Sequence, residues 1–600
     1  MSVQSLTTRR RLLILGLTLG AFVAAEVLRD VNTKTSTLVS MAGWVLFLVL
    51  FLTWGFEGKT WRSSLKDFGR VALLTLLSAA VLSLYYARSE ALDAGAHVDS
   101  AYTYIGLKRF AALDNPITFA GRTPSYAQFP MMLLTHLPAL AVGFGRLGAF
   151  SVVFGMLLQI AFLFALVTKI LAPASLRVQA LIVILMSALF SNRLLVLSYN
   201  LVGYTIPAIC LGLIFLVVVD DEAVPDPGRT VGGLLALSLL HYYTGFAMVL
   251  PLCMAWLLLA RTPIGRIRRF LAQNPVLLAV LALSGITLAT HPELLMERVS
   301  DVTLRVASDQ GLSLLPSKLE KSWNYLTSTY ASLWFRVFFL ENGGDWHMLN
   351  VPPLAGLLVP LVSGSWFLSF WSFRRRCMRY LIYLGVFGVL TLVLSVSQLL
   401  LTDFQHKRSF TVIFALMIAG FSFVLRVPRL GWKLKLLAVS YAVAFGIYNY
   451  VDLAVLRGKV YGTEDHAHRS QQSMEAIAAL LARGEASRLG AGRIYVVVDK
   501  FFPLQSFYLE ALKRYRVPIH VVEAKKFCSD RAAVEQAASV AGCAGFLLVA
   551  HSKQCRDWRA PAGESAGRAI NGDLYESLCG KSAERDRERC RISIQIGRRK

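Results

Sequence analysis

The feature that most constrains the fold is a succession of apolar runs, each about as long as a lipid bilayer is thick. A helix needs about 20 apolar residues to cross ~30 Å of hydrocarbon, because its backbone polar groups must all be satisfied within the helix. Of the 600 residues, 55% are hydrophobic and only 16% are charged, which excludes an ordinary soluble domain. We therefore predict an all-α polytopic membrane domain with about thirteen transmembrane helices. The predicted spans are residues 12–28, 38–55, 71–87, 148–170, 177–191, 201–219, 230–242, 244–260, 273–290, 352–371, 380–401, 409–425 and 435–452.

The distribution of Lys and Arg predicts the orientation, because basic residues concentrate in the short cytoplasmic loops of membrane proteins. With a cytoplasmic N-terminus, the inner loops carry Lys59, Arg62, Lys66, Arg70, Arg261, Arg266, Arg268, Arg269, Arg374, Arg375, Arg376, Arg379, Arg426, Arg429, Lys433 and Lys435. This assignment requires that the apolar segment Phe129–Gly145 does not cross the membrane. We expect an interfacial helix there.

The first apolar run and the high positive charge each have an alternative interpretation. The first apolar run follows Arg9, Arg10 and Arg11 and resembles a signal peptide, but a second span follows closely and no convincing cleavage site is present, so we interpret it as a membrane helix. The net charge of +25 is spread over loops and tail, which favours topology signalling and contact with anionic lipid. We expect no nucleic-acid partner.

Three longer segments fall on the outer side, at about 88–147, 291–350 and from 455 onward. We divide the chain into a membrane domain (1–454) and a C-terminal extramembrane domain (455–600). In the latter, strand patterns at 493–499, 517–523 and 545–550 alternate with helical patterns, which favours an α/β domain with a mostly parallel sheet. The charged run after about residue 560 is expected to be only partly ordered.

The cysteines agree with this topology. Three of the eight, Cys210, Cys253 and Cys377, lie in or beside predicted spans, where a thiol usually serves as a small apolar side chain. The other five lie in the tail, where an oxidising compartment would allow up to two disulfides of undetermined pairing. These are Cys528, Cys543, Cys555, Cys579 and Cys590.

The first outer segment contains a carboxylate among aromatic residues, Asp99 in "AHVDSAYTYIGLKRF". An acid before a helical run is commonly a helix N-cap. A second reading comes from His406, Lys407 and Arg408, which form a cationic cluster on the same predicted side, against the topological bias. Such a cluster either extends toward lipid phosphates or cradles a phosphate group. An acid and phosphate-binding cations at one face suit transfer of a group from a lipid-linked phosphate to a hydroxyl, with the acid as general base.

Five segments, in order, resemble the membrane glycosyltransferases of the GT-C superfamily, in particular the bacterial branch with protein O-mannosyltransferases and the lipid A aminoarabinose transferase. They are "HVDSAYTYIGLKRF", "SYAQFPMMLLTHLPALAVGFGRLGAFSVVFGMLLQIAFLFALVTKIL", "SALFSNRLLVLSYNLVGYTIPAI", "LLALSLLHYYTGFAMVLP" and "FQHKRSFTVIFALMIAGFSFVL". The likeness covers about residues 70–425. Asp99 stands at the position of the family's acid, followed by Ser100 where the family has Glu, and His241 stands where a Lys is usual.

The resemblance implies a GT-C-like enzyme of the bacterial inner membrane, with its active site and C-terminal domain facing the periplasm. It implies inverting transfer of one sugar from a polyprenyl-phosphate donor to a glycan, lipid or protein acceptor. Asp99 would be the base, and the substrate-binding residues would be Arg408, Lys407, His406, Arg193, Tyr102, Tyr204 and His241.

Two alternatives stay open. A divalent metal is possible, since Glu341, Asp345 and His347 in the second outer segment offer suitable ligands. A transporter or flippase of lipid-linked saccharides is the alternative function, although we find no internal repeat of the kind that many transporters contain.

Overall fold

The computed structural model describes most of residues 3–290, isolated helical positions between 382 and 450, and four strands after residue 492. Within 3–290 the main gaps are 56–60, 87–106 and 191–201. The chain divides into two compact units. One comprises residues 1–89, 106–136 and 153–457, and the other comprises 90–105, 137–152 and 458–600.

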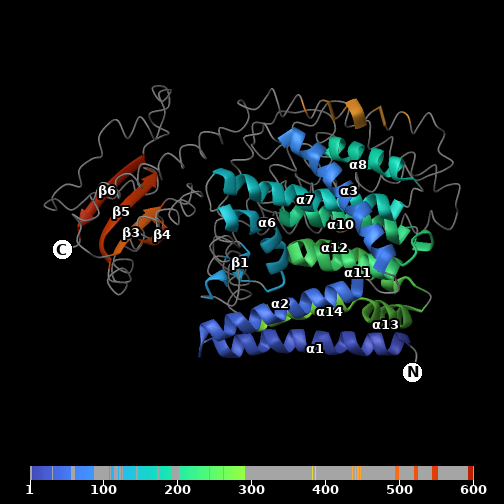
Figure 1. Cartoon of the computed structure of the whole chain (residues 1–600), viewed down its shortest axis with the longest axis horizontal. Helices are drawn as coiled ribbons and strands as arrows, with labels where there is room; N and C mark the ends of the chain where they lie inside the picture. Colours follow the sequence, from blue (N-terminus) through green and yellow to red (C-terminus); the bar gives the residue numbers. More distant parts are fainter. Residues whose placement is uncertain are drawn as a thin grey trace, which may run out of the picture. The chain divides into compact units, whose positions relative to one another are not determined.

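Between residues 3 and 290 the described chain is almost entirely helical (Figure 1). Its helices are α1 (Val3–Arg29), α2 (Thr33–Gly55), α3 (Trp61–Tyr86), α6 (Phe129–Val142), α7 (Arg146–Leu171), α8 (Leu176–Phe190), α10 (Val202–Val219), α11 (Pro227–His241), α12 (Tyr243–Leu258), α13 (Pro263–Gln273) and α14 (Pro275–Thr290). A short 3-10 helix, η2 (Asp221–Ala223), precedes α11, and a two-residue hairpin, β1 (Phe119–Ala120) and β2 (Thr123–Pro124), precedes α6.

Three described helices are long and apolar enough to cross a membrane: Arg9–Arg29, Thr33–Gly55 and Leu65–Tyr85. They coincide with the first three predicted spans. Shorter apolar helices are described at Phe154–Thr168, Leu176–Leu189, Ile209–Val219 and Val249–Leu258, and α13 and α14 form a pair bent by 85°. A mainly helical fold with three candidate membrane spans is therefore confirmed for this part of the chain, whereas the total of about thirteen spans stays a prediction.

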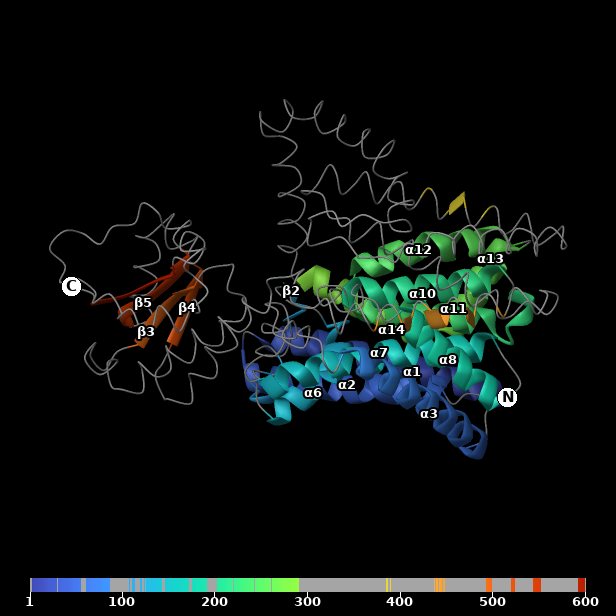
Figure 2. The same ribbon diagram turned by 90° about the horizontal axis from the view of Figure 1, so that it is seen from above.

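The centre of the helical unit is α10. Its residues Ile209–Val219 include ten large or apolar side chains that are at most 3% exposed. Such a helix, apolar all round, belongs inside a bundle. It packs against both α11 and α12, and the three helices lie side by side in two perpendicular views (Figures 1 and 2).

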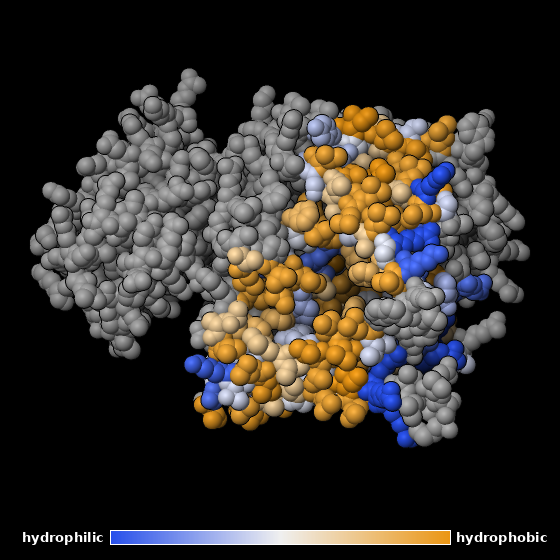
Figure 3. Space-filling model, viewed as in Figure 1, coloured by the Kyte–Doolittle hydropathy of each residue, from blue (hydrophilic) through white to orange (hydrophobic). Residues whose placement is uncertain are grey.

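The helices α1 and α2 show the opposite pattern, because their outward side chains are apolar and uncovered. Leu13 is 64% exposed and Val45 is 62% exposed. On the face drawn in Figure 3, apolar residues cover this helix pair between hydrophilic groups at its two ends. An apolar band with polar ends is the surface that a lipid bilayer requires.

One end of the helical unit gathers basic residues, and we name it the basic end: Arg9, Arg10, Arg11, Arg229, Arg266, Arg268 and Arg269. Hydrogen bonds tie the helices together there. The Arg11 guanidinium donates to the Thr53 carbonyl at 2.9 Å, and the Trp54 indole donates to the Gln273 carbonyl at 2.8 Å. Most of these arginines lie in segments that the sequence predicts to be cytoplasmic, namely the inner loop with Arg266, Arg268 and Arg269 and the N-terminal segment with Arg11.

The apolar segment predicted to lie on the membrane surface contains α6, which has 14 residues. At 1.5 Å per residue it is about 21 Å long, too short to cross ~30 Å of hydrocarbon by itself. This length agrees with a helix that does not cross, while its place at an interface stays a prediction.

In the C-terminal part, four strands form a sheet of order β4-β3-β5-β6: β3 (Arg493–Val498), β4 (Ile519–Glu523), β5 (Cys543–His551) and β6 (Ile592–Arg598). β3 pairs in parallel with β4 and with β5, at the three positions where the sequence predicts strands. β6 pairs antiparallel with β5 inside the run that we expected to be partly ordered; its isoleucines alternate with other residues, as a strand requires. The connecting helices lie outside the described residues, so the α/β character stays a prediction.

Candidate functional site

Of the residues predicted to form the site, only His241 is described with its side chain. Tyr204 is described by its backbone, as part of α10. The others lie outside the described residues: Asp99, Tyr102, Arg193, His406, Lys407 and Arg408, together with the potential metal ligands Glu341, Asp345 and His347.

His241 ends α11, and both of its ring nitrogens have partners. Nδ1 donates to the Leu237 carbonyl oxygen at 2.8 Å, one turn back in the same helix. Nε2 lies 2.6 Å from Oε1 of Gln159, which belongs to α7. The pair therefore joins two apolar helices through a polar contact between residues 82 positions apart in the chain.

The contact continues from Gln159 to α6. Gln159 Nε2 donates to Thr135 Oγ1 at 2.6 Å, and that hydroxyl donates to the Met131 carbonyl oxygen at 2.7 Å. We call His241, Gln159 and Thr135 the histidine relay. Its residues come from α11, α7 and α6, so it fixes these three helices relative to one another.

A glycine permits the close approach of α6 and α7 beside the relay. A Cβ atom added to Gly155 would lie 2.7 Å from the Thr135 carbonyl oxygen, which is closer than the Cβ atoms of folded proteins come to other atoms. Gly155 stands one helical turn before Gln159 on α7. The absence of a side chain there lets Gln159 reach Thr135.

The relay has two complete hydrogen-bonding patterns. In the observed orientation of the Gln159 amide, both ring nitrogens of His241 face oxygen acceptors, a pattern that only a doubly protonated ring would complete. If the Gln159 amide turns over, its N–H₂ donates to a neutral ring and its oxygen accepts from Thr135. The orientation of one amide therefore distinguishes the two patterns and links His241 to the Thr135 hydroxyl.

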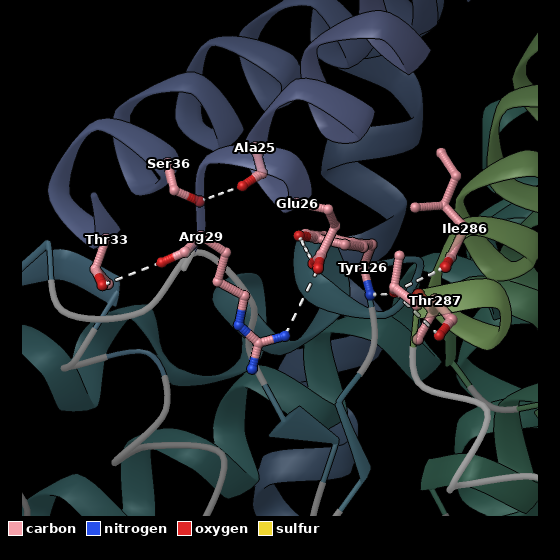
Figure 4. Close-up of polar contacts among 9 residues, drawn as sticks. Ala25, Glu26, Arg29, Thr33, Ser36, Tyr126, Ile286 and Thr287 are labelled. Atoms are coloured by element: carbon pink, nitrogen blue, oxygen red, sulfur yellow. Dashed lines mark hydrogen bonds and ion pairs between the residues drawn. The ribbon is translucent and has the colours of Figure 1, made fainter. Parts of the chain in front are cut away.

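A second polar cluster begins the α6 segment and is drawn in Figure 4. The side chain of Tyr126 is buried, and its hydroxyl donates to the carboxylate of Glu26 in α1. Its backbone N–H donates to Thr287 Oγ1 in α14 at 3.2 Å. The Arg29 guanidinium lies 3.6 Å from the same carboxylate. We call Glu26, Arg29, Tyr126 and Thr287 the tyrosine anchor.

Burial, and to a smaller degree the bond to Glu26, raises the pKa of Tyr126 well above the ordinary value for a phenol. The phenol therefore stays protonated and keeps donating to Glu26 throughout the physiological pH range. This hydrogen bond is charge-assisted, because the acceptor is a carboxylate.

Aromatic rings surround the anchor and hold the start of α6. The rings of Phe22 and Tyr126 lie 5.1 Å apart, and Trp44 stacks on Phe129 at 4.7 Å. Phe110, from the segment before α6, contacts the same Phe129 ring at 4.7 Å. The anchor and the relay thus fix the segment Tyr126–Thr135 from both ends.

Sequence reasoning missed Glu26, Tyr126, Thr135 and Gln159. A signal was present for two of them, since Glu26 and Gln159 are polar residues inside otherwise apolar runs. For Tyr126 and Thr135 no spacing in the sequence indicates which distant helices they contact.

Within the described residues, no three His, Cys, Asp or Glu side chains come together as a metal site would need. The proposed ligands of the second outer segment lie outside that part of the chain, so the metal stays an open prediction. In comparisons with known proteins, no protein-family model and no curated protein sequence matched this chain.

Proposed function

We propose that the protein is a GT-C-type membrane glycosyltransferase that moves a sugar from a polyprenyl-phosphate donor to an acceptor on the periplasmic face of the bacterial inner membrane. The proposal includes about thirteen spans, a cytoplasmic N-terminus and a periplasmic α/β domain. The gathering of Arg9–Arg11, Arg266, Arg268 and Arg269 at one end of the helical unit supports the orientation, because basic residues favour the cytoplasmic side.

The proposed reaction is an inverting displacement at the anomeric carbon. The Asp99 carboxylate takes the proton of the acceptor hydroxyl, and the acceptor oxygen forms the new glycosidic bond as the bond from carbon to phosphate oxygen breaks. The polyprenyl phosphate leaves with the bonding electrons. Arg408, with Lys407 and His406, stabilises its negative charge.

The observation that carries the proposal is the histidine relay. Gln159 and Thr135 belong to the second of the family-like segments and His241 to the fourth, and the relay joins them by hydrogen bonds of 2.6 Å. Two of the segments that resemble the GT-C family therefore meet in space.

The test is a turnover assay on the purified full chain in detergent with radiolabelled polyprenyl-phosphate sugars extracted from a bacterial host. The wild type is compared with Asp99→Asn and with Asp93→Asn, a matched loss of a carboxylate six positions earlier in the same segment. We expect label to move from lipid to acceptor or water in the wild type and in Asp93→Asn, and not in Asp99→Asn. Equal turnover by Asp99→Asn would overturn the assignment of the base.

A second arm separates the alternative function. The wild type is reconstituted in vesicles with the same labelled lipids, and the leaflet of the label is followed. Movement of intact lipid-linked sugar between leaflets, without transfer in any acceptor fraction, would show a transporter and reject the transferase.

A further inference from the structure

The helix α13 lies at the basic end and turns away from the helix that follows it. Its axis makes an angle of 85° with that of α14, at a break formed by Asn274. If α14 crosses the bilayer, a helix at this angle lies nearly in the membrane plane. α13 has 11 residues, too few to span the hydrocarbon.

One side of α13 packs on the protein. Phe270 is 4% exposed, and its ring meets that of Trp256 at 6.2 Å. The Arg266 guanidinium lies 3.0 Å from the Asp221 carboxylate and 4.5 Å from the centre of the Trp256 ring. Arg266 is therefore already neutralised and held by the protein.

A second side is apolar and uncovered. Ile264 is 84% exposed and Leu271 is 38% exposed. They are seven positions apart, with the partly buried Ile267 between them, so the three share one stripe along the helix. An apolar stripe beside lipid-facing spans fits the acyl boundary of a bilayer.

A third side carries Arg268 and Arg269, both exposed. Other arginines of the basic end are engaged: Arg11 bonds the Thr53 carbonyl, and the Arg229 guanidinium lies 5.0 Å over the Trp54 ring. Within the described part of the chain, no carboxylate forms an ion pair with Arg268 or Arg269. Their charge is available to a partner at the membrane surface.

We propose that α13 is an interfacial helix that binds anionic phospholipid, with Ile264 and Leu271 in the acyl boundary and Arg268 and Arg269 on the headgroup phosphates. Protein, lipid and water each meet a different side of the helix, as in amphipathic helices that lie in the plane of a membrane. The break at Asn274 fixes the position of α13 along α11 and α14. The Asn274 amide donates to the Gly228 carbonyl at 3.1 Å and to the Phe270 carbonyl at 2.7 Å. This surface is independent of the proposed transferase.

The test titrates phosphatidylglycerol into the detergent-purified full chain and follows the rise in thermal unfolding temperature. In Arg268→Gln/Arg269→Gln, we expect half of the maximal rise to need about tenfold more lipid, since each basic group near an anionic surface adds to binding. Arg268→Lys/Arg269→Lys keeps the charge and should respond like the wild type. Added salt should weaken the response of the wild type.

The matched control is Arg9→Gln/Arg10→Gln, which removes two exposed charges from the same end but from α1. It should weaken the response less than the α13 variant does, because it removes charge from this end but leaves α13 intact. The proposal fails if the α13 variant responds like the wild type, if the α1 control loses as much, or if phosphatidylcholine raises the unfolding temperature equally.

Discussion

Gln159 of α7 and His241 of α11 form a hydrogen bond of 2.6 Å across 82 residues of sequence. The helices around them are apolar and both side chains are partly buried, so each satisfies a polar atom of the other where few other partners are near. Removing one partner leaves the other partly buried with an unsatisfied polar atom, which costs more than the bond itself contributes.

The first prediction concerns this pair. Gln159→Leu and His241→Leu should each lower the free energy of unfolding by roughly 1–3 kcal/mol, and the double variant should lose clearly less than the two losses added together. Denaturant unfolding of the purified chain measures all three. Thr290→Val, at an exposed residue that bonds only its own helix, should change stability by about 0.5 kcal/mol or less. Additive losses would show that the two side chains are not coupled.

The second prediction concerns the approach of α6 to α7. Gly155→Val should destabilise the protein by about 1–3 kcal/mol, because the valine side chain would collide with the Thr135 backbone. A Cβ atom at this position would already lie 2.7 Å from the Thr135 carbonyl oxygen. Gly285→Ala is the matched control, since no atom lies within 4 Å of its added Cβ. Ala in a helix should there be neutral or stabilising by up to about 1 kcal/mol. Thermal unfolding of both variants checks the contrast, which a tolerated Gly155→Val would refute.

The sequence predicted the helical class well, since the length and polarity of an apolar run are local properties. The first three spans lie at the predicted residues, and so do strands β3, β4 and β5. The sequence does not predict β6, because its alternating isoleucines stand within a highly charged run, and a high charge favours partial order.

The candidate site was less accessible to sequence reasoning. His241 is predicted through the resemblance to the GT-C family, as the residue that stands where a Lys is usual. Its partner Gln159 and the third member, Thr135, lie on other helices, and no local pattern indicates which polar residues of different helices meet. Glu26 was passed over within the first span, although burial of a carboxylate requires partners such as Tyr126 and Arg29.

The third prediction uses the raised pKa of Tyr126. An unfolded tyrosine loses its proton near pH 10. The folded one keeps it to higher pH, so its contribution to stability is complete below about pH 10 and is lost as pH rises above that value. In Tyr126→Phe this alkaline loss should be absent, and the difference in stability from the wild type should shrink above about pH 10.

Unfolding temperatures of the wild type and Tyr126→Phe, measured from neutral to strongly alkaline pH, check this prediction. Other groups titrate equally in the two proteins, so their effect cancels in the difference. At neutral pH the variant should be less stable by roughly 1–3 kcal/mol, because the Glu26 carboxylate loses a donor. A difference that stays constant through the alkaline range would contradict the buried phenol.

The fourth prediction concerns the hinge between α13 and α14. A Cβ on Gly232 of α11 would overlap the side chain of Asn274, whose amide bonds the carbonyls of Gly228 and Phe270. Gly232→Ala should therefore displace Asn274 and lower the free energy of unfolding by about 1–3 kcal/mol. It should also weaken the response to phosphatidylglycerol, because α13 is then no longer held in a fixed position. Gly265→Ala, whose Cβ would meet only Thr262 at 3.6 Å, should be neutral or stabilising by up to about 1 kcal/mol and leave the lipid response unchanged. Thermal unfolding with and without the lipid measures the two effects together, and a destabilised Gly232→Ala with a normal lipid response would separate the hinge from the lipid surface.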